Sequence, residues 1–348
     1  MCHKVKIQIS LCPLLIKSPG GLLSMRSMIL MGLDMPLELT ALSPTLTSGD
    51  DVYVDLHAAA LNKRDYWITK GKYPGLTFPL VLGSDGAGVY NGREVIIDPS
   101  LDWGSDPEYF SPDFRILGMP DHGTLSDQVK VPVHNLYDKP VHLSMLEAAA
   151  LPVCGVTAYR AMMNRGRAKA KEKMLITGIG GGVATMALLF GVAMQMEVWV
   201  TSSSDQKIDQ AILHGATGGA NYSRPHWDKE LAEKLNDKFD LVIDGAGGPE
   251  FTRIIPMMGP RGRVVIYGGT RGNIEALSPQ RIFWKQLDIL GSSMGSPDDF
   301  RDMIAFVNTH RIRPIISHVF SLKDTNKAME IIASGEQFGK VCIDILAG

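Results

Sequence analysis

Cysteines are scarce in this sequence, and none of them is arranged like a metal or disulfide site. The 348 residues include four cysteines, Cys2, Cys12, Cys154 and Cys342, with no CxxC pair among them. Disulfide frameworks and structural zinc sites are recognised by closely spaced cysteines. The pattern therefore predicts neither kind of site, and it favours a reducing compartment.

The sequence also lacks an excess of positive charge and any long apolar run. Its 35 Lys and Arg are balanced by 37 Asp and Glu, so there is no basic surplus to neutralise a phosphate backbone or an anionic membrane. The longest mostly apolar stretch, residues 183–196, contains Gly191 and Gln195 and falls short of the roughly 20 residues that cross a bilayer. We expect a buried helix there, and neither nucleic acid nor a membrane as a partner.

Residues 1–24 contain lysines but no acidic residue. This composition is similar to that of an organelle transit peptide, although it is poor in Arg and Ser. An over-long gene start and a disordered tail are the alternatives. We expect a disordered N-terminal extension, a fold that begins near Met25, and a cytoplasmic protein, or a mitochondrial one if the extension is a transit peptide.

A chain of this length suits two domains with separate cores. In residues 25–149 the β-rich runs are short and separated by Gly and Pro, which indicates a compact, mostly antiparallel barrel without helical periodicity. The expected strands there are residues 27–30, 52–58, 93–97 and 126–131. Ser144 and Glu147 form a capping box, and Pro152 suits the start of a helix that reaches Met163, so we expect the domain boundary near residue 150.

Residues 150–294 alternate strand-like runs with helical segments. The six runs are residues 174–177, 198–201, 219–222, 240–244, 264–267 and 287–290. Such alternation predicts a doubly wound parallel sheet of the α/β class. Residues 295–348 then offer helices over 298–308 and 324–333 and strands over 315–320 and 341–345. This mixed tail is expected to pack back on the first domain.

A glycine-rich turn joins the first of these strands to an apolar helix. Its motif reads Gly178-x-x-Gly181-x-x-Ala184. Glycines let backbone amides approach a pyrophosphate, and a helix N-terminus offers unpaired N–H groups with partial positive charge. A glycine-rich loop alone is often only a tight turn, but the alternating strands and helices favour a dinucleotide site. The predicted contacts are Gly178, Gly180, Gly181, Gly182 and Val183.

The end of the second strand bears on the choice between NAD and NADP. An NAD enzyme usually places an acid there, about 20 residues past the glycines, whereas this sequence reads Thr-Ser-Ser-Ser-Asp-Gln-Lys over residues 201–207. Ser202, Ser203 and Lys207 could bind a 2′-phosphate through charge-assisted hydrogen bonds. The alternative is a solvated serine turn in which Ser204 or Asp205 caps the next helix. We predict NADPH as the cofactor.

Several ordered motifs together resemble the medium-chain dehydrogenase/reductase superfamily, in its zinc-independent quinone oxidoreductase and enone reductase-like branch. They are His-Ala-Ala-Ala-Leu-Asn-Lys-Arg-Asp at 57–65, Gly-Lys-Tyr-Pro at 71–74, Pro-Leu-Val-Leu-Gly-Ser-Asp-Gly-Ala-Gly at 79–88, Gly-Thr-Leu-Ser at 123–126, Ala-Ala-Ala-Leu-Pro at 148–152, Thr-Ala-Tyr at 157–159 and Gly-Lys-Val at 339–341. The resemblance implies a split GroES-like β-barrel catalytic domain and a doubly wound Rossmann cofactor domain.

The resemblance also bears on metal. Zinc-dependent members use Cys, His and Cys around a catalytic zinc. The matching places here hold Asn62, Ser84 and Val153, with Cys154 one step out of register. Three such poor ligands imply that no metal is bound. The four-cysteine lobe of those enzymes is replaced by an acidic, aromatic and proline-rich loop over residues 98–122, which is a lid, a specificity wall or an interface.

Site roles carry over by motif. The resemblance implies that Asn62 and Tyr73 lie near the substrate, Thr157 beside the nicotinamide, Lys207 and Tyr222 around the adenosine phosphate, and Gly268 and Gly269 along the nicotinamide ribose. Each has a structural alternative. Asn62 could hold a strand-to-helix turn with Asp65. Tyr73 could be an ordinary loop aromatic and Tyr222 a groove-filling strand residue, while Trp67 and Trp103 suit packing.

Without a Lewis acid, an alcohol loses the usual stabilisation of its alkoxide, whereas a conjugated acceptor spreads the arriving charge itself. The resemblance therefore implies hydride transfer from NADPH to a quinone or an α,β-unsaturated carbonyl. Two alternatives stay open, a zinc-independent carbonyl or alcohol-type reductase and a non-catalytic, crystallin-like NADPH-binding protein. The apolar run at residues 286–293 suggests an edge strand that pairs in a homodimer.

Overall fold

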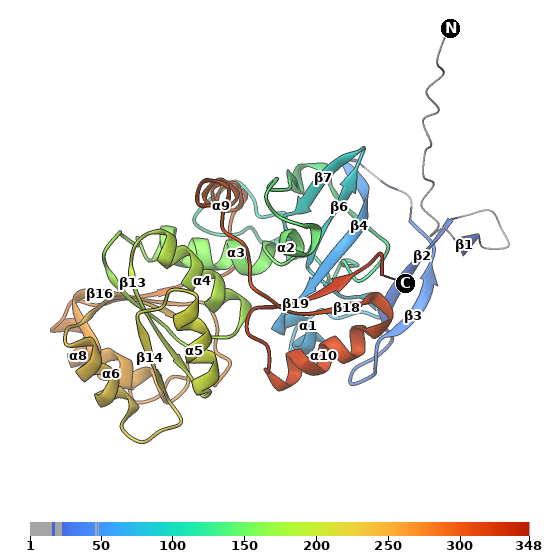
Figure 1. The fold of residues 1–348 in the computed structure, drawn as a ribbon. Coiled ribbons are helices and arrows are strands. Elements are labelled where there is room, and N and C mark those ends of the chain that lie inside the picture. Colours follow the sequence, from blue (N-terminus) through green and yellow to red (C-terminus); the bar gives the residue numbers. More distant parts are fainter. Residues whose placement is uncertain (1–15, 18–22, 46, 48, 348) are drawn as a thin grey trace, which may run out of the picture.

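The computed structural model describes residues 16–17, 23–45, 47 and 49–347. The prediction of a disordered extension over residues 1–24 falls almost entirely outside these residues. Figure 1 shows two lobes side by side, one built around a parallel sheet and the other around curved antiparallel sheets. The chain is thus an α/β protein with a GroES-like barrel and a Rossmann domain, as the sequence predicts.

The barrel lobe contains a seven-stranded sheet in the order β11-β7-β6-β4-β19-β18, with β10 also paired to β4. Its strands are β4 (Asp51–Leu61), β6 (Asp85–Tyr90), β7 (Arg93–Ile97), β10 (Gln128–Pro132), β11 (Leu136–Asp138), β18 (Ile316–Ser321) and β19 (Lys340–Asp344). A second sheet holds β1 (Ile16–Lys17), β2 (Leu23–Leu30), β3 (Glu38–Leu42) and β5 (Leu80–Val81), and β8 (Ser100–Leu101) pairs with β9 (Arg115–Ile116). Since β19 pairs antiparallel with β4, the last strand of the chain lies beside one of its earliest.

Helices of the barrel lobe are short. They are α1 (Lys63–Thr69), α2 (Met145–Ala149), α10 (Thr325–Ser334) and the 3-10 turns η1 (Val133–Asn135) and η4 (Leu322–Asp324). The predicted capping box is confirmed, because Ser144 Oγ accepts the Glu147 N–H at 3.2 Å and a Glu147 carboxylate oxygen accepts the Ser144 N–H at 2.8 Å. Helix α1 has seven residues, too few to display a helical period, so the sequence indicated it only through the alternative that Asn62 and Asp65 hold a strand-to-helix turn.

The Rossmann lobe holds a six-stranded sheet in the order β14-β13-β12-β15-β16-β17, with every pair parallel. Its strands are β12 (Lys173–Ile176), β13 (Glu197–Ser202), β14 (Gly218–Asn221), β15 (Phe239–Asp244), β16 (Met258–Ile266) and β17 (Asp288–Gly291). The six predicted strands are therefore confirmed, and the strand order reverses between β12 and β15. At such a reversal the loops after neighbouring strands diverge and leave a crevice for a ligand.

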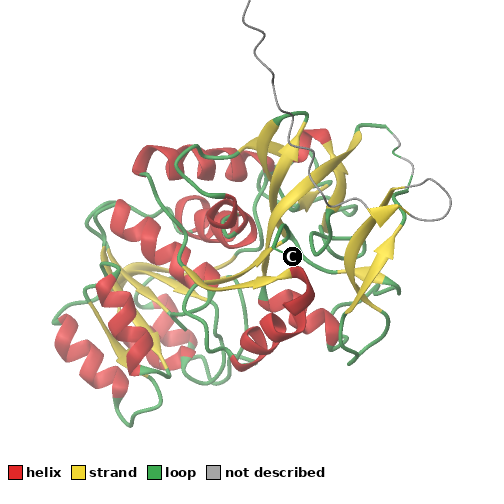
Figure 2. Ribbon diagram, turned by 45° about the vertical axis from the view of Figure 1, so that its right-hand side comes forward, coloured by secondary structure: helices red, strands yellow, loops and turns green. Residues whose placement is uncertain are grey.

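Helices lie on both sides of this sheet (Figure 2). They are α3 (Pro152–Tyr159), the π-helical η2 (Arg160–Arg165), α4 (Gly182–Ala193), α5 (Asp205–Leu213), α6 (Trp227–Leu235), α7 (Phe251–Ile254), the 3-10 turn η3 (Ile255–Met257), α8 (Pro279–Phe283) and α9 (Pro297–His310). Most of α4 is buried, as its apolar sequence predicts. Within the described residues, no helix has the length and apolarity needed to cross a membrane.

Candidate functional site

The glycine-rich turn lies between β12 and α4, directly at the reversal of strand order. Gly178 has φ +65° and Gly180 has φ +117°, backbone conformations that favour glycine over any residue with a Cβ. Helix α4 begins at Gly182 and runs for 12 residues, so its first N–H groups point toward the crevice at the end of the sheet. The residues present therefore fit the pyrophosphate of a dinucleotide.

Polar contacts fix the loops that form the far side of this crevice. Thr177 Oγ1 donates to Asp244 Oδ1 at 2.5 Å, and the Gly247 N–H donates to Asp244 Oδ2 at 3.0 Å. Burial raises the pKa of Asp244 above its ordinary value. A Cβ on Gly268 would lie 3.0 Å from the carbonyl oxygen of Gly245, so glycine permits the close approach of the loops after β15 and β16.

The sequence left two interpretations of the serine turn after β13, a phosphate site and a helix cap, and the structure contains the helix cap. Ser204 Oγ accepts the Lys207 N–H at 3.4 Å, at the start of α5. Ser202 is buried, whereas Ser203 is exposed. Asp205 pairs with Arg224 at 2.8 Å, so its charge is partly offset. The cap leaves the hydroxyls of Ser202 and Ser203 beside the end of β13, where a ribose or its phosphate would lie in this fold.

Lys207 and Tyr222 have different partners in the structure. The Lys207 ammonium donates to the carbonyl oxygen of Gly335, the C-cap of α10, and its side chain packs beside Gly180. Burial lowers the pKa of Lys207. The exposed guanidinium of Arg271 lies over the Tyr222 ring, 4.8 Å from its centroid. Arg271 was not predicted, and its contact with Tyr222 adds a second cation to this end of the crevice.

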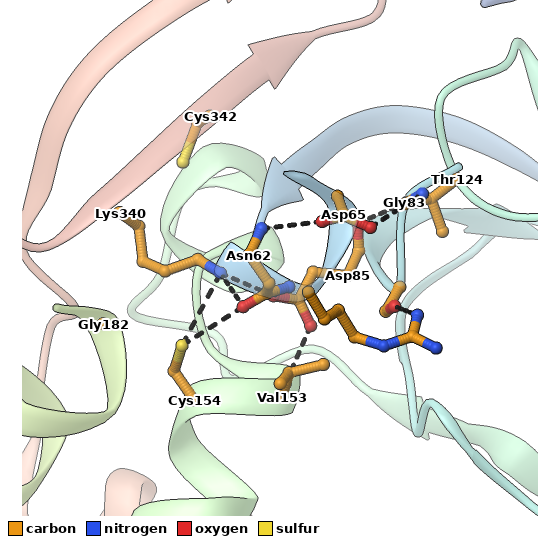
Figure 3. Close-up of polar contacts among 12 residues, drawn as sticks. Asn62, Asp65, Gly83, Asp85, Thr124, Val153, Cys154, Gly182, Lys340 and Cys342 are labelled. Carbon is orange, nitrogen blue, oxygen red and sulfur yellow. Dashed lines mark hydrogen bonds and ion pairs between the residues drawn. The ribbon is translucent and has the colours of Figure 1, made fainter. Parts of the chain in front are cut away.

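Four buried side chains meet where the barrel lobe faces the glycine turn: Asn62, Asp85, Cys154 and Lys340 (Figure 3). We call them the Lys340 cluster. The Lys340 ammonium donates to Asn62 Oδ1 at 2.7 Å, to Asp85 Oδ2 at 2.7 Å and to Cys154 Sγ at 3.7 Å. Burial opposes the charge on Lys340, but the Asp85 carboxylate and the Cys154 sulfur outweigh it and raise the pKa of Lys340. The Asp85 carboxylate thus favours the charged form of the buried lysine.

Asn62 has the central place in this cluster. Its Nδ2 donates to Asp85 Oδ2 at 2.8 Å, and its Oδ1 also accepts the Cys154 thiol at 3.3 Å. Its backbone N–H donates to Asp65 at 2.7 Å at the start of α1. The backbone of Asn62 thus bonds at the strand-to-helix turn, and its side chain bonds to the cluster.

A second cation, Arg64, lies beside the cluster. It donates to Ser84 Oγ at 2.6 Å, and Ser84 in turn donates to the carbonyl oxygen of Leu117 at 2.6 Å. The same guanidinium lies 5.5 Å from the ring centroid of half-buried Tyr73. Arg64 thereby links Tyr73, one predicted substrate residue, to the segment that carries Asn62, the other.

These residues do not fit a catalytic zinc ion. Such a site needs three good ligands around an open position, but the Ser84 hydroxyl is committed to Arg64 and Leu117, and Val153 offers only a backbone N–H, which donates to Asp85 at 2.7 Å. Burial raises the pKa of the Cys154 thiol to about 11. A cation placed beside the Lys340 ammonium would be repelled. Among the described residues, no group of three or more His, Cys, Asp or Glu could hold a metal.

The loop over residues 98–122 is packed around Trp103, which is 3% exposed. Phe110 and Phe114 lie edge-on to its ring at centroid distances of 5.8 and 5.2 Å, and the Arg160 guanidinium lies 5.1 Å from it. Trp103 is therefore a packing residue, as we expected. An aromatic core stabilises this loop at the place where zinc-dependent members have four cysteines.

Thr157 lies in α3 with its hydroxyl 4.0 Å from the Met294 sulfur, at the border between the two lobes. Sequence reasoning missed Asp85, Lys340, Arg64 and Arg271. Asp85 and Lys340 both belong to motifs named in the sequence analysis. They are 255 residues apart in the chain, and their contact depends on the pairing of β19 with β4. The sequence did contain a signal for Lys340, because a lysine placed directly between a glycine and a buried apolar strand is unusual.

Known proteins share this architecture. A model of the alcohol dehydrogenase GroES-like domain matches residues 48–141, and one of zinc-binding dehydrogenases matches residues 178–309. The chain is 38% identical over 340 residues to the zinc-type alcohol dehydrogenase-like protein YogA of Leptosphaeria maculans, across 89% of this chain and 95% of that protein. It is 26% identical over 327 residues to quinone oxidoreductase-like protein 2 of Bos taurus, across 90% of each.

A crystal structure of an NAD-dependent alcohol dehydrogenase matches with a TM-score of 0.87 at 31% identity, across 92% of this chain and 99% of that one. The fold, the sequence identity and the coverage all point to the same family. The chain belongs to the medium-chain dehydrogenase/reductase superfamily of oxidoreductases.

Proposed function

We propose that this chain is an NADPH-dependent oxidoreductase that transfers hydride to a quinone or an α,β-unsaturated carbonyl without zinc. The observation that carries the proposal is the Lys340 cluster, in which a buried ammonium bonds to Asn62, one of the three residues at the zinc-ligand places, and to Asp85 and Cys154 beside it. The name of the bovine quinone oxidoreductase-like relative supports the same substrate class.

The bound nicotinamide would supply the hydride. The chain's own residues orient the acceptor. The amide of Asn62 donates a hydrogen bond to the acceptor's carbonyl oxygen, and Tyr73, packed on Arg64, forms a wall of the substrate pocket. A conjugated acceptor spreads the arriving negative charge, so a hydrogen-bond donor can serve where a simple alcohol would need a Lewis acid.

The cofactor would lie across the reversal of strand order. Backbone amides of the glycine turn (Gly178, Gly180, Gly181, Gly182 and Val183) would receive the pyrophosphate, Thr157 would flank the nicotinamide, and Gly268 and Gly269 would pass its ribose. Tyr222 and Arg271 would flank the adenosine. Ser202, Ser203 and Lys207 would bind the 2′-phosphate.

NADPH is favoured because β13 ends in Ser202 and not in an acid. The name of the similar NAD-dependent alcohol dehydrogenase favours NADH instead. That name and the zinc-type name of the fungal relative also favour a second candidate, an alcohol-type carbonyl reductase. We also propose a homodimer paired through β17, the edge strand of the Rossmann sheet.

The test is a steady-state assay of NADPH and NADH oxidation with a panel of quinones and enones, beside simple aldehydes and ketones. We expect turnover of the conjugated acceptors with NADPH and little with the saturated carbonyls. Preference for the saturated carbonyls would favour the alcohol-type reductase. Tight NADPH binding without turnover of any acceptor would favour a non-catalytic, crystallin-like protein and contradict the proposal.

A further inference from the structure

The Lys340 ammonium has all three of its hydrogens engaged by the protein. Its acceptors are Asn62 Oδ1, Asp85 Oδ2 and Cys154 Sγ, and its side chain is 3% exposed beside an Asp85 side chain that is fully buried. Burying an ammonium is strongly unfavourable unless it is paired and hydrogen-bonded. Because no hydrogen of Lys340 remains for a ligand, its effect on a substrate must pass through its partners.

Lys340 and Asp85 together determine which way the Asn62 amide points. The amide oxygen faces the ammonium, and the amide nitrogen faces the carboxylate. Turning the amide over would bring Nδ2 against the ammonium and Oδ1 against the carboxylate, so both contacts would become repulsive. The charged pair therefore allows one orientation only.

This orientation leaves Asn62 with one kind of bond to offer. Oδ1 already accepts from Lys340 and Cys154, which uses both of its lone pairs. Nδ2 has two hydrogens, and within the described residues only one of them has an acceptor, Asp85. Asn62 can therefore donate to a ligand but cannot accept from one.

We propose that Lys340 is a positioning residue that makes Asn62 a hydrogen-bond donor only, and that the site therefore favours a carbonyl oxygen over a hydroxyl group, whose oxygen can accept the same bond but whose hydrogen finds no acceptor on Asn62. The inference rests on the proposed function, which places Asn62 at the substrate. The ammonium also polarises the amide, because hydrogen bonds in series strengthen one another. The polarised N–H faces the oxygen on which negative charge develops as hydride arrives.

The cluster also connects substrate and cofactor positions. A Cβ on Gly182 would lie 2.5 Å from Cys154 Sγ and 2.9 Å from Lys340 Cδ, and the Gly339 N–H donates to the carbonyl oxygen of Gly180 at 3.0 Å. The strand that carries Lys340 is thus held against the glycine turn. The Asn62 donor is thereby kept at a fixed place relative to the cofactor.

The experiment compares two unreactive ligands that differ only at oxygen, a saturated ketone and the matching alcohol, as competitive inhibitors of enone reduction. In the wild type we expect the ketone to bind at least tenfold more tightly. Equal inhibition by the two ligands would overturn the inference without any variant. A wild type that turns over no acceptor would instead contradict the proposed function.

The variant that tests Lys340 itself is the double substitution Lys340→Met with Asp85→Asn. Lys340→Met alone would leave a buried carboxylate without its cation and could prevent folding, whereas removing both charges of a buried pair is often tolerated. With both charges absent the Asn62 amide can turn over. We expect the ketone-to-alcohol preference to fall about tenfold or more toward equality and kcat to fall, while the affinity for NADPH stays within about twofold, a factor worth less than 1 kcal/mol.

Lys139→Met is the matched control. Lys139 is also a buried lysine of the barrel lobe, bonded to the carbonyl oxygen of Leu143 and paired with Glu94, but it has no contact with the Lys340 cluster. Its loss should lower the melting temperature and leave the ketone-to-alcohol preference unchanged. A folded double variant that keeps the preference would make Lys340 merely structural, and one that loses NADPH affinity alone would make it a cofactor contact. Either result overturns the inference.

Discussion

Two lysines lie beside the glycine turn in opposite surroundings. Lys340 faces the Asp85 carboxylate, which keeps the pKa of Lys340 high. Lys207 donates to the neutral carbonyl of Gly335, and burial lowers its pKa despite the opposing effect of the Glu336 carboxylate. A carbonyl is a weaker partner for an ammonium than a phosphate is. Lys207 is therefore the lysine that can exchange its present partner for a phosphate, while Lys340 is fixed.

Replacing Lys207 by Ala tests this assignment. Loss of a charge-assisted contact worth roughly 1.5–3 kcal/mol should weaken NADPH binding by about one to two orders of magnitude. NADH lacks the 2′-phosphate, so its affinity should hardly change. Titration of both nucleotides against wild type, Lys207→Ala and Lys229→Ala gives the comparison, because Lys229 is an exposed lysine of the same lobe.

The ratio of the two affinities decides the outcome. Lys207 also bonds to Gly335 and packs beside Gly180, so a general loosening of the turn would weaken both nucleotides together. If the NADPH-to-NADH ratio in Lys207→Ala equals that of the wild type and of the Lys229→Ala control, Ser202, Ser203 and Lys207 form no phosphate site.

At the scale of single elements, the predicted homodimer depends on β17. Among the residues that the structure describes, this strand pairs with β16 alone, and the preceding α8 segment exposes Phe283 and Trp284 by 57% and 80%. An unpaired edge beside exposed aromatic rings is a surface that another chain can cover. We expect light scattering to report a dimer at micromolar concentration and Trp284→Glu to shift it toward the monomer.

Leu213→Glu is the control for that substitution. Leu213 is 85% exposed on α5. Leu213→Glu therefore introduces the same charge on another face of the molecule and should leave the dimer intact. A wild type that scatters as a monomer would refute the pairing of β17. Dissociation by both substitutions alike would show that added charge, and not the β17 edge, is responsible.

Regular elements of this chain could be predicted from sequence because they carry local signals. The four inner strands of the Rossmann sheet, β12, β13, β15 and β16, are mostly buried and appear as short apolar runs, and α9 and α10 have amphipathic periods. Helix α1 has only two turns and no such period. The helix predicted from Pro152 to Met163 is present as α3 and η2, but the sequence did not indicate that η2 is π-helical.

The site could be predicted only in part, for the same reason. Asn62, Tyr73 and the glycine turn stand in motifs that resemble those of a family. What the side chains do depends on partners from distant segments: Asn62 meets Lys340 across 278 residues, and Tyr222 meets Arg271 from the loop after β16. Such meetings are set by strand order, which a single sequence does not display.

Across the whole molecule, the last strand joins the two lobes. The chain leaves the barrel lobe, builds the Rossmann lobe and returns with β19 beside β4 (Figure 1). The return brings Gly339 to the glycine turn and Lys340 to Asn62. A buried ion pair between Arg160 and Asp299, at 2.6 Å, joins α9 to the π-helical turn η2. Asn62, the proposed substrate donor, and the glycine turn are thus held together by the fold itself.

That arrangement leads to the central proposal, that the chain works without zinc and that the Lys340 ammonium instead bonds to Asn62, one of the three residues matched to zinc ligands. The most direct measurement is the metal content of the purified protein by mass spectrometry, with NADPH-dependent enone reduction assayed before and after dialysis against a chelator. We predict zinc far below one ion per chain and undiminished activity after dialysis. One tightly bound zinc per chain, with activity lost on its removal and restored by its return, would contradict the account.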